Sequence, residues 1–410
     1  MASMLKKSEG IEQSRRRQRF SSHSNSYSSA NSQRIRIDVN TSDEYLDLAN
    51  SYLVFDMVVA GATTGVGLPR YTASSFIKEI RIKDRSGGLI GENIQDYSVL
   101  ARSAFEMNVN DEAEKSYYDV LEGATGVALA TATGIASRQY AHRIVSSIFA
   151  SKNYFPAHLL GGISLELDMK AAQNVVLQTS GETGATYTIN NLALVCDLVK
   201  LKPEVETMIL NQVQSGGLTV DYVSHHTVKA TIQASSGGQR FDLGSLNGRV
   251  KSLTSVQIIA AANASVDELL SFPHNNTSHY RFKLGSRYLS ESQVECGAGK
   301  QAEYVMEYLK SQKVNCNQNI AQYGNATNLN GTKLFDTKFV IGQQADRSNT
   351  DSVLSSLKDK DSNRLELELT YSSAPTAATL YVFVEMDKRL VIFPGRQHQD
   401  NDFQGQGTMM

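Results

Sequence analysis

The sequence predicts an all-β protein made of two tandem jelly-roll β-sandwiches (a double jelly roll), with short helices in the connections. Three observations lead to this prediction. Strand-like patterns separated by Gly-marked turns run through most of the chain, whereas helical patterns are few. The 410 residues suffice for two domains that each bury a core. Finally, the stretch GGISLELDMK (161–170) has a counterpart in NRLELELTYS (363–372) in the other half of the chain.

The two halves end with the same pair of strand patterns. In each half, an alternating strand with acidic residues on one parity precedes a longer apolar strand that ends near Lys or Arg. The pairs are GISLELDM with LALVCDLVKL and RLELELTY with TLYVFVEMDKRL. A repeat unit of this size indicates a duplicated domain rather than a solenoid. A sandwich of about eight strands with long connections is a jelly roll.

Residues 1–33 are predicted to form an extended or disordered arm. The stretch SRRRQRFSSHSNSYSSANSQ is too polar to bury the apolar surface that would offset its ordering entropy. Residues 1–36 carry eight basic and two acidic side chains in a chain of net charge −2, so the arm is basic and the body mildly acidic.

Six cations of this arm are candidates for contact with the genome, acidic lipid headgroups or neighbouring subunits, because Arg contacts to phosphate are strong and independent of sequence. They are Lys6, Lys7, Arg15, Arg16, Arg17 and Arg19. The alternatives are a solvated tail, a localisation signal, or an arm that orders only against protein neighbours.

The first jelly roll is expected at 34–202. It begins at RIRIDVN, where Ile35, Ile37 and Val39 alternate with polar residues as in a half-buried strand. A helix is expected at 93–108, inside a long connection, because its apolar residues fall near one side. The further strand patterns are YLVFDMVVAG (52–61), SFIKEIRIKD (75–84), RQYAHRIVSSIFAS (138–151), GGISLELDMK and NNLALVCDLVKL (190–201).

A helical link at 203–217 and a second jelly roll at 218–393 follow. The link has Pro203 at a first helical position, acidic residues in its first turn, and Gly216 as a stop. The second roll has a helical pattern at 301–312, and the tail at 394–410 is polar and predicted to be loose. The strand patterns lie at 218–234, 249–263, 337–344, 363–372 and 378–393.

Motifs for catalysis or cofactors are weak in this chain. Three scattered cysteines form no C-x-x-C pair, which argues against a disulfide framework or a zinc site. The Gly-rich stretch GATTGVGLP lacks the Lys of a P-loop, and adjacent His225 and His226 would point to opposite faces of a strand. No apolar run reaches membrane-spanning length and the N-terminus is polar, so we expect synthesis in a cytosol-like compartment. We expect no enzyme activity and no cofactor.

Four regularly spaced carboxylates support the main alternative to a purely structural function. Glu166 and Asp168 share a strand face, and so do Glu366 and Glu368. Paired carboxylates can act as acid and base in glycoside cleavage, so a two-domain β-sandwich protein that binds or cleaves glycans is the second hypothesis. The favoured interpretation is a solvated or subunit-facing strand surface. The chain has no Trp, the side chain that carbohydrate sites use most.

Four stretches resemble the major capsid proteins of the double jelly-roll virus lineage. The first, RIRIDVNTSDEYLDLANSYLVFDMVV (34–59), is similar to the family's first strands after an N-terminal arm. The second, at 75–100, resembles the strand, turn and helix that follow. The stretches at 154–177 and 192–210 resemble the late strands of the first roll and the link to the second. The likeness covers most of 34–393 at the level of layout.

This resemblance implies a structural protein of the virion. It implies homotrimers in which six similar wedges form a pseudo-hexagon, and these trimers tile an icosahedral shell. The implied partners are other copies of the chain, penton and minor capsid proteins, and the genome or an inner membrane through the arm. The implied location is the virion capsid, with synthesis in the host cytoplasm. A third possibility, one shell domain with one projecting domain, is disfavoured by the two matching halves.

Overall fold

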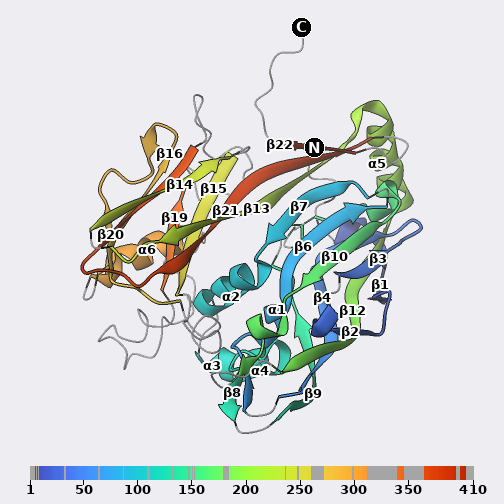
Figure 1. Ribbon diagram of the computed structural model, residues 1–410. Helices are drawn as coiled ribbons and strands as arrows, with labels where there is room; N and C mark the ends of the chain where they lie inside the picture. The colour runs from blue at the N-terminus through green and yellow to red at the C-terminus, as the bar shows by residue number, and fades with distance from the viewer. Residues whose placement is uncertain are drawn as a thin grey trace.

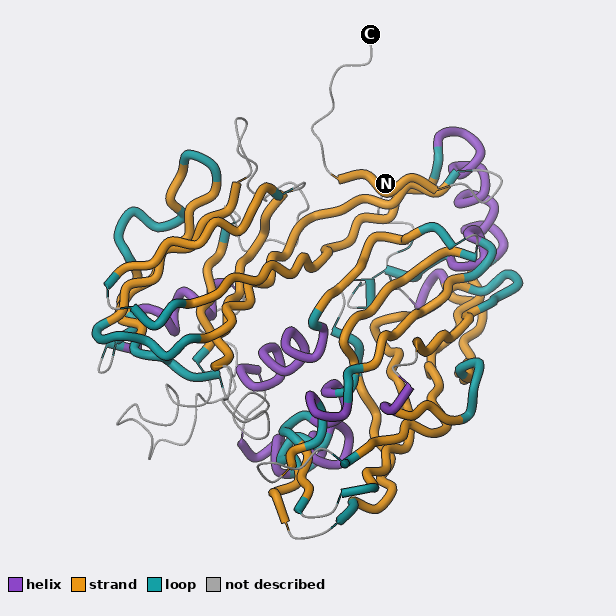
Figure 2. The backbone as a smooth tube through the Cα atoms, in the orientation of Figure 1, coloured by secondary structure: helices purple, strands orange, loops and turns teal. Residues whose placement is uncertain are grey.

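The computed structural model describes residues 5–402 apart from short gaps of one to five residues and longer gaps at 260–271, 312–338, 346–363 and 394–397. Antiparallel strands dominate, and helices lie in the connections (Figures 1 and 2). The prediction of an all-β double jelly roll is confirmed.

The first roll is a sandwich of two sheets. Sheet A has the strand order β1-β12-β4-β9, and sheet B has the order β3-β10-β6-β7. Strand β2 (Ser26–Ser28) also pairs with β12. The bounds in sheet A are β1 Glu12–Ser21, β12 Thr186–Leu201, β4 Tyr45–Ala60 and β9 Ile135–His142. The bounds in sheet B are β3 Arg34–Val39, β10 Ile163–Met169, β6 Ile77–Asp84 and β7 Leu89–Gln95.

The second roll repeats this arrangement. Sheet C has the order β13-β21-β15-β19, and sheet D has the order β14-β20-β16-β17. The bounds in sheet C are β13 Leu218–Ile232, β21 Ala378–Ile392, β15 Arg249–Ile259 and β19 Val340–Gln344. The bounds in sheet D are β14 Gly238–Ser245, β20 Arg364–Tyr371, β16 Thr277–Leu284 and β17 Arg287–Tyr288. Strand β18 (Val294–Glu295) also pairs with β16.

Taken in chain order, the strands of these four sheets occupy identical places in the two rolls. In each roll, one sheet holds the first, eighth, third and sixth strands in that order, and the other holds the second, seventh, fourth and fifth. The two alternating stretches quoted above are β10 and β20, the seventh strand of each roll. Both have neighbours on either side, so they are inner strands of their sheets. The chain therefore folds into the same sandwich twice.

The helices and minor strands lie in the connections. The link helix α5 (Pro203–Gly216) separates the rolls and starts at proline, as predicted. Helices α2 (Tyr97–Asn108), α3 (Asp111–Lys115) and α4 (Tyr117–Glu122) lie between the fifth and sixth strands of the first roll, and α6 (Gln301–Ser311) occupies the same place in the second. The remaining elements are α1 Thr72–Ser75, the small sheet of β5 Val66–Leu68, β8 Val127–Ala130 and β11 Leu177–Gln178, and the 3-10 turns Glu9–Ile11, Ser29–Asn31, Ala157–Leu160 and Ala172–Asn174.

Strand β1 corrects the predicted boundary at residue 34. Residues 12–21 were expected to belong to an extended or disordered arm, but they pair with β12 from Glu12–Leu201 to Ser21–Ala193. Phe20 on β1 is buried in the core of the first roll. The arm is therefore the first strand of the roll, because backbone pairing and one buried ring supply what its composition lacks.

Two further boundaries differ from the prediction. The helix expected at 93–108 begins only at Tyr97, because 93–95 complete β7 and Asp96 adopts a left-handed φ of 51° at the junction. The polar tail was expected to be loose, but His398–Asp402 forms β22, which pairs with β21. Strand β15 pairs with β21 only as far as Asp387, so the last residues of β21 have an open edge. The backbone of the tail pairs there, and this pairing needs no apolar side chains.

The two rolls share one buried apolar cluster. The interior of the first roll continues into Val256, Ile258 and Phe383, which lie on the outer face of sheet C. A separate cluster fills the interior of the second roll. Helix α2 lies between the rolls (Figure 1). Sheet C therefore has buried apolar residues on both faces, and the second roll is packed against the sheet B side of the first.

Candidate functional site

The described cations among the predicted contact residues are Lys7, which precedes β1, and four arginines on β1, and they fall into two groups. The first group is neutralised inside the chain around Asp47, a fully buried carboxylate on β4. Lys7 Nζ lies 2.5 Å from Asp47 Oδ1, and Arg15 Nη1 donates to Asp47 Oδ2 at 2.9 Å. Arg15 also reaches Asp197 at 3.1 Å on β12. These contacts fasten the N-terminal segment across sheet A.

The charge at Asp47 is compensated despite its burial. Burial alone would raise the pKa of this carboxyl, but hydrogen bonds from Lys7, Asn50 and Arg15 outweigh it and hold the pKa below its usual range. Asn50 Nδ2 donates to Asp47 Oδ2 at 2.8 Å. Asp47 is thus an ionised anchor for cations of the first strand. The sequence prediction did not include Asp47, although an Asp flanked by two leucines in DEYLDLANSYL is a usable signal.

Arg16 belongs to the neutralised group as well. Its guanidinium donates two hydrogen bonds of 2.6 Å to Glu44. Lys6 lies outside the described residues. Of the six predicted contact residues, Lys7, Arg15 and Arg16 therefore have carboxylate partners in their own chain.

Arg17 and Arg19 form the second group, with neutral acceptors. Arg17 donates to the Tyr52 hydroxyl and lies 5.5 Å from the centroid of that ring. Arg19 donates to the carbonyl oxygen of Asn191 at 2.8 Å. Contact of the arm with genome or membrane stays a prediction, and Arg17 and Arg19 are its best-placed residues.

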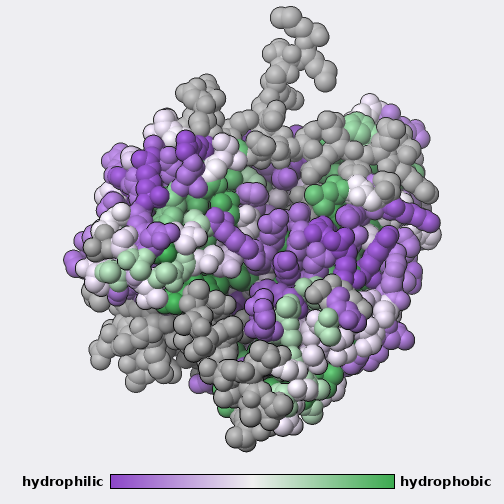
Figure 3. Space-filling model, viewed as in Figure 1, coloured by the Kyte–Doolittle hydropathy of each residue, from purple (hydrophilic) through white to green (hydrophobic). Residues whose placement is uncertain are grey.

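The four candidate carboxylates are tied into ladders of opposite charge. On sheet B, Glu166 Oε2 lies 2.9 Å from Lys83 Nζ, and Asp168 accepts from Arg34 at 2.7 Å and lies 3.0 Å from Arg81. Figure 3 shows the resulting hydrophilic surface over β6 and β10.

The second roll has the same kind of ladder on sheet D. Glu366 accepts from Arg240 and lies 3.4 Å from Lys283, while Glu368 accepts from Arg281 at 2.8 Å. The hydrogen bond from Arg240 lowers the pKa of Glu366. A general acid for glycoside cleavage needs a raised pKa, so this geometry favours a structural cross-strand role.

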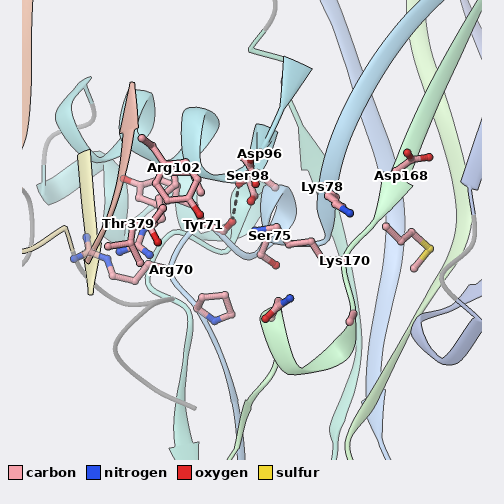
Figure 4. Close-up of a pocket in the computed structure, with 18 of the residues that line it drawn as sticks. Arg70, Tyr71, Ser75, Lys78, Asp96, Ser98, Arg102, Asp168, Lys170 and Thr379 are labelled. Atoms are coloured by element: carbon pink, nitrogen blue, oxygen red, sulfur yellow. Dashed lines mark hydrogen bonds between the residues drawn. The ribbon is translucent and has the colours of Figure 1, made fainter. Parts of the chain in front are cut away.

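A cleft with a volume of about 710 Å³ lies between the rolls, beside α2 (Figure 4). Its walls come from sheet B and α2 on one side and from Ile258, Thr379 and Tyr381 of sheet C on the other. Arg70, Lys78 and Lys170 bring positive charge, and Asp96 and Asp168 bring negative charge.

A buried charge cluster closes the α2 end of this cleft. Arg102 Nε donates to Glu106 at 3.4 Å along the helix, and its guanidinium carbon lies 4.7 Å from the ring centroid of Phe272. Arg70 bonds Glu114 on α3 and lies 3.7 Å from Glu106. Because these groups join α2 and α3 to the second roll, the cluster acts as a clasp between the rolls.

The contact between the rolls also has a polar rim. Thr227 on β13 donates to the carbonyl oxygen of Gln95 at 2.8 Å. The next outward residue, Lys229, pairs with Asp96 at 2.6 Å. A cation on the first strand of the second roll therefore meets an acid that follows the fifth strand of the first roll.

Other chemistry is weak in the described part of the chain. Within it, no three His, Cys, Asp or Glu side chains gather into a group that could hold a metal ion. Burial raises the pKa of the Cys196 thiol to about 12, so this thiol is not a reactive nucleophile. None of the described helices is long and apolar enough to cross a membrane.

Comparison with solved structures identifies the fold. PBCV-1 VP54, from a crystal structure fitted into a reconstruction of the virophage Sputnik, matches with a TM-score of 0.63 and 9% identity over 94% of this chain and 96% of that chain. The Faustovirus major capsid protein matches with a TM-score of 0.65 and 8% identity over 92% and 90%. The mavirus major capsid protein matches with a TM-score of 0.52 and 10% identity over 96% and 90%.

These matches cover nearly the whole of this chain and nearly the whole of each matched chain. The chain therefore has the double jelly-roll fold of viral major capsid proteins, as the sequence resemblance implied. Its likeness to them lies in the fold, since no family model and no curated protein matches its sequence.

Proposed function

We propose that this chain is a major capsid protein. It assembles into homotrimers, and each trimer presents six similar sandwiches that tile an icosahedral shell. The observation that carries the proposal is the identical strand order of the two rolls, combined with the fold of known capsid proteins over more than nine-tenths of the chain.

The repeated sandwich supplies the physical reason for this role. Two copies of one shape in a single chain allow a three-fold assembly to approximate six-fold symmetry, which fills a flat lattice. Sandwich cores are rigid, and here a shared apolar cluster makes the two rolls a single unit. The chain works as a structural protein without catalysis.

The partners and location follow from the same role. The chain contacts two other copies within a trimer and then neighbouring trimers. Penton and minor capsid proteins complete the shell, and the basic first strand is the candidate for contact with the genome or an inner membrane. The chain is made in the host cytoplasm and ends in the virion.

The particle state of the purified full chain tests the proposal. Sedimentation velocity is expected to give a species of three times the 44.9 kDa chain mass, and electron microscopy is expected to show pseudo-hexagonal particles or shells. A chain that stays monomeric at high concentration would contradict the proposal. Glycan cleavage that is lost in Glu366→Gln would favour the glycan hypothesis instead.

A further inference from the structure

We propose that the outer face of sheet A binds the second roll of another copy of this chain, through the segment that follows β17. This inference rests on the proposed trimer and names its contact surface. The outer face carries a hollow of about 800 Å³, called here the sheet A groove. Its lining includes Arg17, Arg19, Tyr52, Leu121, Arg143 and Val195.

The groove concentrates positive charge. Arg17 and Arg19 have the neutral acceptors described above, and Arg143 donates to the carbonyl oxygen of Ala49 at 3.3 Å. Among the described residues, no carboxylate pairs with any of these three guanidiniums. The groove is thus set up to receive an acidic partner, in contrast to the neutralised cations around Asp47.

An apolar rim borders the groove on α4. Val120 is 66% exposed, Tyr117 57% and Leu121 42%, and Leu121 itself lines the groove. A helix with three large apolar side chains in solvent is unusual for a monomer. A basic groove beside an apolar rim fits a protein partner better than nucleic acid alone.

The chain contains a template for the missing contact. Sheet C is the equivalent of sheet A in strand order, and its outer face is already covered within the chain. The covering elements are β7, the fifth strand of the first roll, and α2 in the connection that follows it. Lys229 on β13 pairs there with Asp96, which directly follows β7.

Applying the same contact to sheet A identifies its partner. Strand β1 is the equivalent of β13, and both strands carry cations: Arg17 and Arg19 on β1, and Lys229 on β13. The equivalent of β7 is β17, and the acids that follow it are Glu291 and Glu295. Glu291 is exposed, and Glu295 is partly exposed beside Lys300 at 3.3 Å. The segment 289–296 is therefore the acidic match to the groove.

The partner must belong to another copy. The second roll of the same chain already packs on the sheet B side, while sheet A is the opposite layer of the same sandwich. The groove of one copy and the acidic segment of the next make a head-to-tail contact. Such contacts close into a ring when the rotation allows it, and three copies satisfy the proposed trimer.

Charge reversal of both sides tests the proposal. The groove variant is Arg19→Glu with Arg143→Glu, and the segment variant is Glu291→Arg with Glu295→Arg. Each is expected to weaken trimer formation at least tenfold by sedimentation equilibrium. The quadruple variant combines all four substitutions, restores opposite charges across every contact, and is expected to recover the trimer. Circular dichroism and thermal unfolding verify that each variant is folded.

A matched control separates this effect from a change in net charge. Arg36→Glu with Arg85→Glu alters the charge equally on sheet B and its turn, and is expected to leave the trimer intact. A groove variant that still forms trimers, or a combined variant that fails to recover, would overturn the inference while leaving the capsid proposal standing. A wild-type chain that never trimerises overturns both.

Nucleic acid is the competing occupant of the groove. A gel-shift titration with a 20-nucleotide single-stranded DNA at rising salt measures it directly. If the groove variant loses DNA binding and keeps its trimer, the groove is a nucleic-acid site and the proposal fails. Equal DNA binding by wild type and groove variant, with loss of the trimer only, supports the docking surface.

Discussion

Asp47 illustrates how a single carboxylate can order a segment whose composition predicts disorder. It is fully buried, yet it holds Lys7 and Arg15 from a stretch of chain with almost no apolar side chains. Breaking a buried pair is costly because the remaining charges lose their partner inside the protein. The N-terminal strand is therefore held by charge as well as by backbone pairing.

Substitution of Asp47 is expected to be far more damaging than substitution of its neighbour Asp197. Asp47→Ala should lower the free energy of unfolding by about 3 kcal/mol, the range for a broken buried pair. Asp197→Ala removes a partly exposed partner of the same Arg15 and should cost less than about 1 kcal/mol. Urea unfolding of both variants measures the difference. Equal losses would show that Asp47 does not anchor the strand.

His158 is expected to make stability depend on mild acid. Burial lowers the pKa of this imidazole below its ordinary 6.5, and its ring packs edge-on against Tyr45 at 4.7 Å. The unfolded chain then takes up the proton first, so this contribution to stability is present above pH 6.5 and declines as the pH falls below it.

Thermal unfolding between pH 8 and pH 5, about the range in which His titrates, measures this effect. The midpoint of the wild type should fall toward the acid end, and His158→Gln should reduce that slope. His23→Gln is the control, because His23 is exposed and takes no part in the contact between His158 and Tyr45. An unchanged slope in His158→Gln would contradict the assignment.

At the scale of elements, the sequence predicted those strands and helices whose side-chain pattern follows their burial or marks their ends. Strand β20 alternates buried and half-buried residues, so its pattern was readable. The start of helix α5 was predictable because Pro203 and the acidic residues after it are typical of a first helical turn. Strand β1 was missed because it is an edge strand whose outer face is open, and only Phe20 on it is buried. Backbone pairing to β12 leaves no trace in composition.

Removal of the first strand is expected to destabilise the fold rather than trim a tail. A chain that lacks residues 1–21 loses β1, exposes the edge of β12 and uncovers the site of Phe20. A loss of about 2 kcal/mol or more should lower the midpoint of unfolding by a few degrees, because both rolls contribute to one transition. Differential scanning calorimetry measures it. A chain shortened by residues 403–410 is the control and should unfold as the wild type does.

At the scale of the molecule, the sequence predicted the repeat but not the contact between the two rolls. The stretch TLYVFVEM of β21 is apolar on both parities, which is typical of a strand buried on both faces. Its inward residues fill the second roll, and Phe383 on its outer face packs toward the first. Which surface covers such a strand depends on residues far away in the chain, and a single sequence does not pair them.

The shared cluster predicts that the two rolls unfold together. Phe383 is 2% exposed between the rolls, and Phe282 is fully buried inside the second roll. Each Phe→Ala change removes a similar ring and should cost about 3–5 kcal/mol. If the rolls are coupled through the outer face of sheet C, the position of the lost ring decides whether the unfolding transition stays single or separates into two. Calorimetry of the wild type should give one cooperative transition.

Phe282→Ala should lower that single transition without dividing it, because the contact between the rolls is intact. Phe383→Ala should separate it into two transitions, because the interiors of the rolls are preserved while their contact is weakened. In the proposed trimer the angle between the sandwiches would then no longer be fixed, so Phe383→Ala should also reduce regular particles in electron micrographs. A single transition in both variants would mean that the polar rim and the Arg102 clasp suffice to couple the rolls.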